Sequence, residues 1–116
     1  MKKRLYVKIR YIFRIWNLIP TEAEIIKSKL PHNRIEISPY YCNKKKRVIS
    51  MPINKRFDSN QVKQLISKLK IDSNQYGVYV SIVSERDWDG VRLPEPVRLA
   101  VFKLGGHIDF SYTCVQ

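Results

Sequence analysis

The sequence predicts one α+β domain in which three helices lie on one face of a mostly antiparallel sheet. Its 116 residues suit a single domain. Apolar residues alternate with period two in five segments and recur at helical spacing in three others, in the order β-α-β-β-α-β-α-β. The first six segments have the order of a ferredoxin-like split βαβ unit, so the last helix and strand would extend a ferredoxin-like core.

The first strand is predicted over residues 5–16, because apolar side chains alternate along it. One side of such a strand faces the core and the other meets solvent or a partner. The second side carries Tyr6, Lys8, Arg10, Ile12, Arg14 and Trp16. The helix that follows is expected over residues 22–30, with Thr21 and Glu24 at capping-box spacing. It would bury Ala23, Ile26 and Leu30.

Two short strands, over residues 34–38 and 47–53, are expected to form a hairpin. The segment between them, residues 39–46, is polar and ends in three lysines. The sequence therefore predicts a hairpin with a basic tip.

The C-terminal half alternates helices and strands. A second helix is predicted to be capped by Asp58 or Ser59 and carries an amphipathic stripe. A strand over residues 76–84 is rich in Val, Tyr and Ile. A third helix follows Leu93, has prolines suited to its first turn and is ended by two glycines. The last strand, over residues 107–114, alternates apolar and polar side chains.

Positive charge is concentrated in the first half of the chain. The net charge is +12. Residues 1–56 hold 15 Lys and Arg against 3 Asp and Glu, whereas residues 57–116 hold 7 of each. Such a field attracts anionic partners, namely nucleic acid, acidic lipid or an acidic protein face.

The two cysteines, Cys42 and Cys114, form no CxxC pair and have no histidine at metal-ligand spacing. We expect two reduced thiols in or near a core. Charged residues interrupt the apolar N-terminal segment, and no uncharged apolar run has the length of a signal peptide or a membrane span. We therefore expect a cytoplasmic protein without a membrane partner, metal or cofactor.

If the helices cover one sheet face, the opposite face is open. Lys8, Arg10 and Arg14 would lie on it, together with Tyr79. Aromatic residues interleaved with cations can stack bases and hold phosphates, although a solvated strand face has the same composition. A second candidate anion-binding element is the run Lys44, Lys45, Lys46 and Arg47, which could bind phosphates without sequence preference. These four charges would be equally stable if they were simply exposed to water at a hairpin tip.

The last strand also carries groups with catalytic potential. His107, Asp109 and Ser111 point the same way, which permits general acid–base chemistry of a nuclease-like kind. Alternating polar residues are nevertheless usual on an exposed strand, so the pattern has little specificity.

The charged loop over residues 85–92 allows two interpretations. Asp87, Asp89 and Gly90 are similar to part of a calcium loop, but Pro96 stands where the ligating glutamate belongs. Trp88 is better interpreted as a protein-contact anchor, or as a side chain folded back onto the core. The candidate contact residues of this loop are Arg86, Asp87, Trp88 and Asp89.

The C-terminal third resembles a bacterial protein family in its amino-acid sequence. The similar stretches are residues 76–83 (Tyr-Gly-Val-Tyr-Val-Ser-Ile-Val), 89–91 (Asp-Gly-Val), 93–94 (Leu-Pro) and 105–111 (Gly-Gly-His-Ile-Asp-Phe-Ser). The family is an α+β family catalogued as domain of unknown function number 4279. The order of predicted elements is similar over most of the chain, whereas the amino-acid sequence is similar only over residues 76–111. Its members occur beside polymorphic toxin genes and are taken to be immunity proteins.

The resemblance implies a cytoplasmic immunity protein, of the contact-dependent growth inhibition type, that is not an enzyme. It would be a monomer, or a heterodimer with a cognate toxin whose acidic surface it covers. The expected contacts are Lys8, Arg10, Arg14 and the loop around Trp88. The first alternative is a small basic RNA- or DNA-binding domain. The second and least favoured alternative is a nuclease-like enzyme acting through His107 and Asp109.

Overall fold

The computed structural model describes residues 7–31, 33–84 and 92–114. In this part of the chain a five-stranded, mostly antiparallel sheet is accompanied by three α-helices, which confirms the predicted α+β class. The elements are β1 (Val7–Leu18), α1 (Pro20–Lys29), β2 (Glu36–Tyr40), β3 (Asn43–Pro52), α2 (Ser59–Lys68), the short 3-10 helix η1 (Ser73–Gln75), β4 (Tyr76–Ser84), α3 (Glu95–Leu104) and β5 (His107–Cys114).

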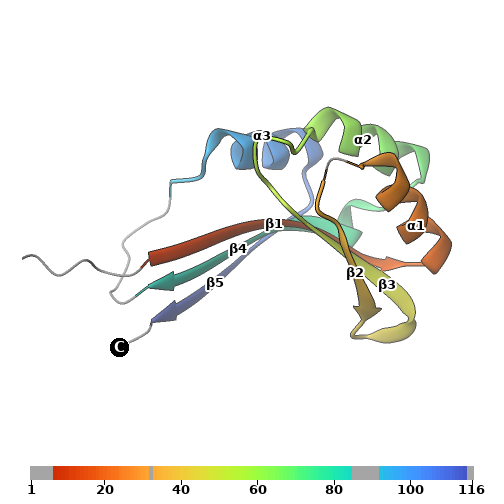
Figure 1. The fold of residues 1–116 in the computed structure, drawn as a ribbon, viewed down its shortest axis with the longest axis horizontal. Coiled ribbons are helices and arrows are strands. Elements are labelled where there is room, and N and C mark those ends of the chain that lie inside the picture. Colours follow the sequence, from red (N-terminus) through yellow and green to blue (C-terminus); the bar gives the residue numbers. More distant parts are fainter. Residues whose placement is uncertain (1–6, 32, 85–91, 115–116) are drawn as a thin grey trace, which may run out of the picture.

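The strands lie side by side in the order β2-β3-β1-β4-β5. β1 pairs antiparallel with both β3 and β4, and β2 pairs antiparallel with β3. Only β5 is parallel to its neighbour β4, because α3 carries the chain back across the sheet between them. The three helices lie on one side of the sheet, and the β2–β3 hairpin turns away from them on the other side (Figure 1).

The core fills the space between the helices and the sheet. Phe13 of β1 is fully buried, and its ring centroid lies 5.6 Å from that of Phe57 and 5.8 Å from that of Tyr76. The Tyr76 hydroxyl donates a 2.8 Å hydrogen bond to the carbonyl oxygen of Leu104, so the end of α3 is tied to the start of β4. The helices contribute Ala23, Ile26, Val62, Ile66, Val97, Ala100 and Leu104.

The helix termini follow local chemistry. α1 begins at Pro20, and the Glu22 side chain accepts a 3.1 Å hydrogen bond from the Ile19 backbone nitrogen. The predicted cap at Thr21 was therefore wrong, because a proline is favoured at the first helical position, where its missing N–H costs nothing. α2 is capped by Asp58, as predicted.

Two glycines allow close approaches that no side chain would permit. A Cβ atom on Gly77 of β4 would collide with the backbone carbonyl oxygen of His107, and would lie 2.9 Å from the His107 Cβ. Gly106 has a φ of 84°, and a Cβ there would lie 2.5 Å from the Tyr76 carbonyl oxygen. Both glycines therefore fix how α3 and β5 join β4.

The hairpin differs from its predicted form. β3 begins at Asn43, and the pairing of Tyr40 with Asn43 leaves only two residues, Tyr41 and Cys42, in the turn. The basic run thus belongs to β3 and not to the connection, but it directly follows the turn, so the end of the hairpin is basic, as predicted.

The prediction about the cysteines was half right. Both thiols are free, but Cys42 in the hairpin turn and Cys114 at the end of β5 are exposed, not close to the core. Among the described helices, none has the length and hydropathy needed to cross a lipid bilayer.

Candidate binding face

The sheet face opposite the helices is the candidate binding face. Alternation along β1 sends Phe13 and Ile15 into the core, so that Lys8, Arg10 and Arg14 lie on the other face. Lys8 and Arg10 are exposed, whereas Arg14 is half-buried. Neither Lys8 nor Arg10 has an ion-pair partner among the described residues. The face therefore offers uncompensated positive charge.

The strand register places one row of residues across all five strands. Arg14 of β1 is opposite Ser50 of β3 on one side and Gly77 of β4 on the other. Ser50 is paired with Glu36 of β2, and Gly77 with His107 of β5. The row thus joins residues that lie up to 93 positions apart, with Arg14 at its centre and one acidic residue at its β2 end.

Aromatic rings accompany the cations on this face. The Arg14 guanidinium carbon lies 4.4 Å from the ring centroid of Tyr79, which is a cation–π geometry. The Trp16 ring lies 5.7 Å from the His107 ring, between centroids. Sequence reasoning named Arg14 and Tyr79 together but missed the pair of Trp16 with His107. The only sequence indication was that Trp16 shares the alternation of Arg10 and Arg14.

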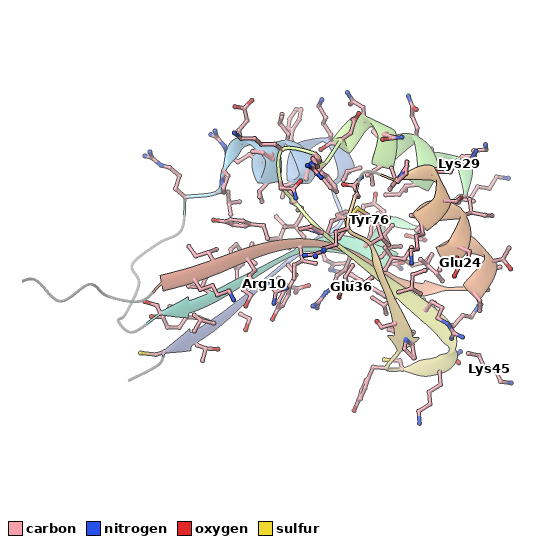
Figure 2. The ribbon with its side chains drawn as sticks, in the orientation of Figure 1. Arg10, Glu24, Lys29, Glu36, Lys45 and Tyr76 are labelled. Atoms are coloured by element: carbon pink, nitrogen blue, oxygen red, sulfur yellow. The ribbon has the colours of Figure 1, made fainter. Side chains whose placement is uncertain are left out.

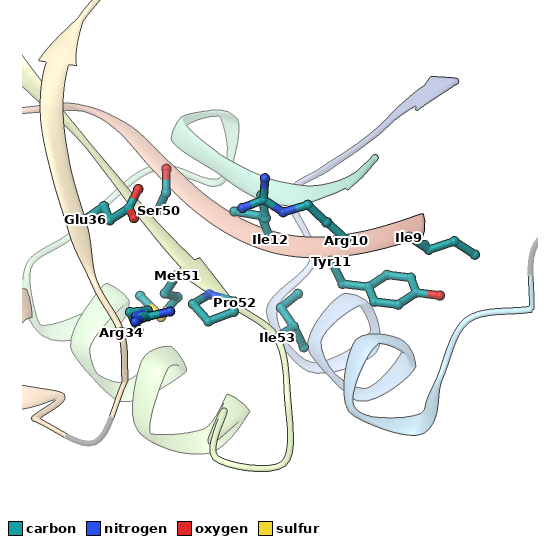
Figure 3. Close-up of a pocket in the computed structure, with 10 residues that line it drawn as sticks. All are labelled: Ile9, Arg10, Tyr11, Ile12, Arg34, Glu36, Ser50, Met51, Pro52 and Ile53. Carbon is teal, nitrogen blue, oxygen red and sulfur yellow. The ribbon is translucent and has the colours of Figure 1, made fainter. Parts of the chain in front are cut away.

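A hollow of about 340 Å³ lies where β3 ends beside β1. Figure 3 shows Arg10 and Glu36 on the side away from the helices, with Tyr11 and Ile53 on the helix side. Partial burial raises the pKa of the Tyr11 hydroxyl. Arg34 joins the same hollow, so two guanidinium groups and one carboxylate line it. This composition suits recognition of a polar partner.

A second hollow of about 380 Å³ lies between the hairpin and the end of β1. Arg14, Trp16, Tyr40 and Tyr41 line it, and Tyr41 is 97% exposed at the turn. The pKa of the Tyr40 hydroxyl is raised, chiefly by its hydrogen bond with Cys42 and to a smaller extent by desolvation. Tyr40 therefore stays a neutral aromatic group at physiological pH.

The run Lys44, Lys45, Lys46 and Arg47 extends the positive charge along the hairpin. Figure 2 shows Lys45 at the far end of the hairpin, away from the helices. The Arg47 Nη1 atom donates to the carbonyl oxygens of Lys44 and Lys46, both at 3.0 Å. Arg47 is therefore partly engaged in holding the strand, which leaves the three lysines as the candidate anion contacts.

The acid–base candidates all lie on the open face of β5. His107, Asp109 and Ser111 are opposite Gly77, Tyr79 and Ser81 of β4. His107 and Asp109 are exposed, and the His107 ring contacts Trp16. In the described part of the chain no three His, Cys, Asp or Glu side chains are grouped so that they could hold a metal ion.

The loop candidates Arg86, Asp87, Trp88 and Asp89 lie outside the described residues, as does Tyr6. Their contribution to a binding surface stays a prediction.

Comparisons with protein-family models, with curated proteins and with solved structures found no match to this chain. The resemblance to the bacterial immunity-type family therefore stays a prediction.

Proposed function

We propose that this protein is a cytoplasmic immunity protein that neutralises a cognate toxin by stoichiometric association through the open face of its sheet. The observation that carries the proposal is the composition of that face. It combines Arg10 and Lys8, which have no ion-pair partners among the described residues, with Trp16 and Tyr79. Trp, Tyr and Arg are the residues most enriched among interface hot spots.

Charge indicates the kind of toxin surface that would fit. A face on which several cations outnumber two acidic residues, Glu36 and Asp109, is complementary to an acidic patch, and complementary potentials accelerate association. The hairpin that carries Lys45 borders the face and would enlarge the contact (Figure 2). A stable complex of this kind buries on the order of 1,600 Å² in total.

The proposal is tested by producing the protein together with the product of the adjacent toxin gene. We expect the two chains to co-purify with equal stoichiometry and the toxin-producing cells to survive. The double substitution Arg10→Glu and Arg14→Glu should lower the affinity for the toxin by about 100-fold or more. The two introduced carboxylates would repel the acidic surface of the toxin that the two arginines attract.

Lys63→Glu is the matched control, because Lys63 is an exposed cation of α2 on the helix side. It changes the net charge in the same direction and should leave both complex and survival nearly unchanged. Equal losses for the control and for the double variant would contradict the proposed face, and the absence of any complex would contradict the proposed function.

A second candidate function is binding of single-stranded nucleic acid on the same face. It is favoured by the Arg14–Tyr79 and Trp16–His107 contacts, because aromatic and guanidinium planes stack on bases without sequence preference. Such binding would weaken steeply with salt as phosphate counterions are released. No mobility shift of a labelled oligonucleotide at low salt would remove this candidate.

We also propose an assignment for the core of the fold. We interpret the elements from β1 to β4 as a ferredoxin-like core to which α3 and β5 are added. Along the chain, α1 connects β1 to β2, and in the sheet β3 lies between these two strands. This arrangement supports a split βαβ unit. The parallel pairing of β5 with β4 is the feature that differs from an all-antiparallel sheet.

A further inference from the structure

The two edges of the sheet are built differently. β2 forms one edge with only five residues, among them Glu36 and Pro39, and its pairing with β3 is irregular after Pro39. Short length, proline and charge are the features that protect an edge strand against pairing with another chain. β5 forms the other edge with eight residues in unbroken register, without proline, lysine or arginine. Of those protections, this second edge has only the single charge of Asp109.

The unprotected edge also exposes apolar surface. Ile108, Phe110 and Tyr112 are opposite Val78, Val80 and Ile82, so they point to the helix side of the sheet. Their side chains are nevertheless 43%, 58% and 43% exposed. Figure 1 shows β5 running out past α3, so the helix layer does not extend along the whole strand.

This strip is comparable in size to the largest apolar patch of a typical monomer, roughly 300–600 Å², and such a patch is often functional. With about 200 Å² for a fully exposed aromatic side chain, the three residues expose on the order of 300 Å². Contiguous apolar patches larger than a few hundred Å² are rare on monomers and mark interaction sites.

We propose that β5 pairs antiparallel with β5 of a second copy of this chain, about a two-fold axis at Phe110. The strand has the same pattern in both directions from that residue, with apolar side chains at 108, 110 and 112 and polar ones at 107, 109, 111 and 113. The register places Phe110 opposite Phe110 and Ile108 opposite Tyr112. An interface of this symmetry uses one surface twice, which is how most dimers form.

The β5 edge adds no like-charge contact to the pairing with a second copy. Two chains of net charge +12 repel each other, yet β5 carries a single formal charge, on Asp109. In the proposed register each Asp109 is opposite Ser111 and each His107 is opposite Thr113, so no like charges meet. The dimer would join the open faces of both copies into one surface.

The expected affinity is modest. The two apolar strips bring on the order of 600 Å² together, and even with the paired backbones the contact stays below the roughly 1,600 Å² of a standard interface. We expect a dimer with a Kd on the order of micromolar, and one that is favoured by salt because screening weakens the repulsion between the two copies.

The association is tested by sedimentation of the full chain from about 5 to 500 µM. We expect the mean mass to rise from monomer towards dimer. Phe110→Lys should abolish the rise, whereas Phe102→Lys should not, because Phe102 is a large apolar side chain of α3 that is 87% exposed but does not belong to β5. A wild-type chain that stays monomeric throughout would overturn the proposal, as would equal effects of the two substitutions.

Register is tested by cross-linking. In a chain with Cys42→Ser and Cys114→Ser, Phe110→Cys should form an intermolecular disulfide on mild oxidation, because the Cα atoms of directly opposed residues in an antiparallel pair lie about 4.5–5.5 Å apart, within the range that a disulfide spans. Ile108→Cys in the same background should not, since two copies of residue 108 lie far from each other in this register. A cross-link at 108 and none at 110 would overturn it. Loss of toxin binding by Phe110→Lys without any wild-type dimer would assign this edge to the toxin instead, against the proposal.

Discussion

Gly77 occupies the point on β4 where the fifth strand comes closest. The missing Cβ atom lets the His107 backbone lie directly against it, and His107 in turn brings its ring to Trp16 on the open face. Gly77 is therefore both a packing requirement of the sheet and a determinant of the aromatic pair on the binding face.

Gly77→Ala should lower the free energy of unfolding by about 1–3 kcal/mol, the usual cost of forcing extra atoms into a packed site. The obstacle is a backbone carbonyl group, which cannot rotate away as a flexible side chain would. Urea unfolding measures the effect, with Ser81→Ala on the same face of β4 as the control. A stability equal to wild type would show that β4 and β5 can separate locally at no cost.

At the scale of the element, α2 depends on its cap. The Asp58 side chain accepts hydrogen bonds from the backbone nitrogens of Asn60, at 3.0 Å, and Gln61, at 3.2 Å. These donors have no partner within the helix, so the carboxylate both satisfies them and places a negative charge at the helix N-terminus.

Asp58→Ala should therefore destabilise the protein by about 1 kcal/mol, a typical value for the loss of an N-cap. Asp58→Asn keeps the accepting oxygen and should remain close to wild type. Thermal unfolding followed by circular dichroism distinguishes the two variants. If both lose the same stability, the contribution of this cap is its charge and not its hydrogen bonds.

Elements could be predicted from sequence where local chemistry decides them. The strands over residues 76–84 and 107–114 have the predicted bounds, because alternation and flanking glycines define them. β1 continues two residues beyond its predicted end, to Leu18, and the basic run belongs to β3, because strand pairing sets those limits. The row through Arg14 and His107 could not be predicted, since register between distant strands is a property of the packed sheet.

For the whole molecule, the dominant property is charge. The chain has a net charge of +12 at neutral pH, and the whole excess of positive charge lies in residues 1–56, which include β1 and the β2–β3 hairpin. A net charge far from zero favours solubility but destabilises a compact state through self-repulsion.

Raising sodium chloride from about 20 to 300 mM at pH 7 should therefore raise Tm by a few degrees, because the Debye length falls well below the size of the domain. Scanning calorimetry at low protein concentration measures the shift. Near the isoelectric point of about 9.9 the net charge vanishes, so the salt effect should become small there. A Tm that decreases with salt at pH 7 would mean that attractive charge pairs outweigh the repulsion.

The protected β2 edge limits what the exposed β5 edge could build. Once two copies join along β5, every remaining border of the combined sheet is a β2 border, which carries Pro39 and Glu36. Assembly would therefore close at two subunits and could not propagate into a fibril, even though the strand that mediates it has the unguarded character of an amyloid-prone segment.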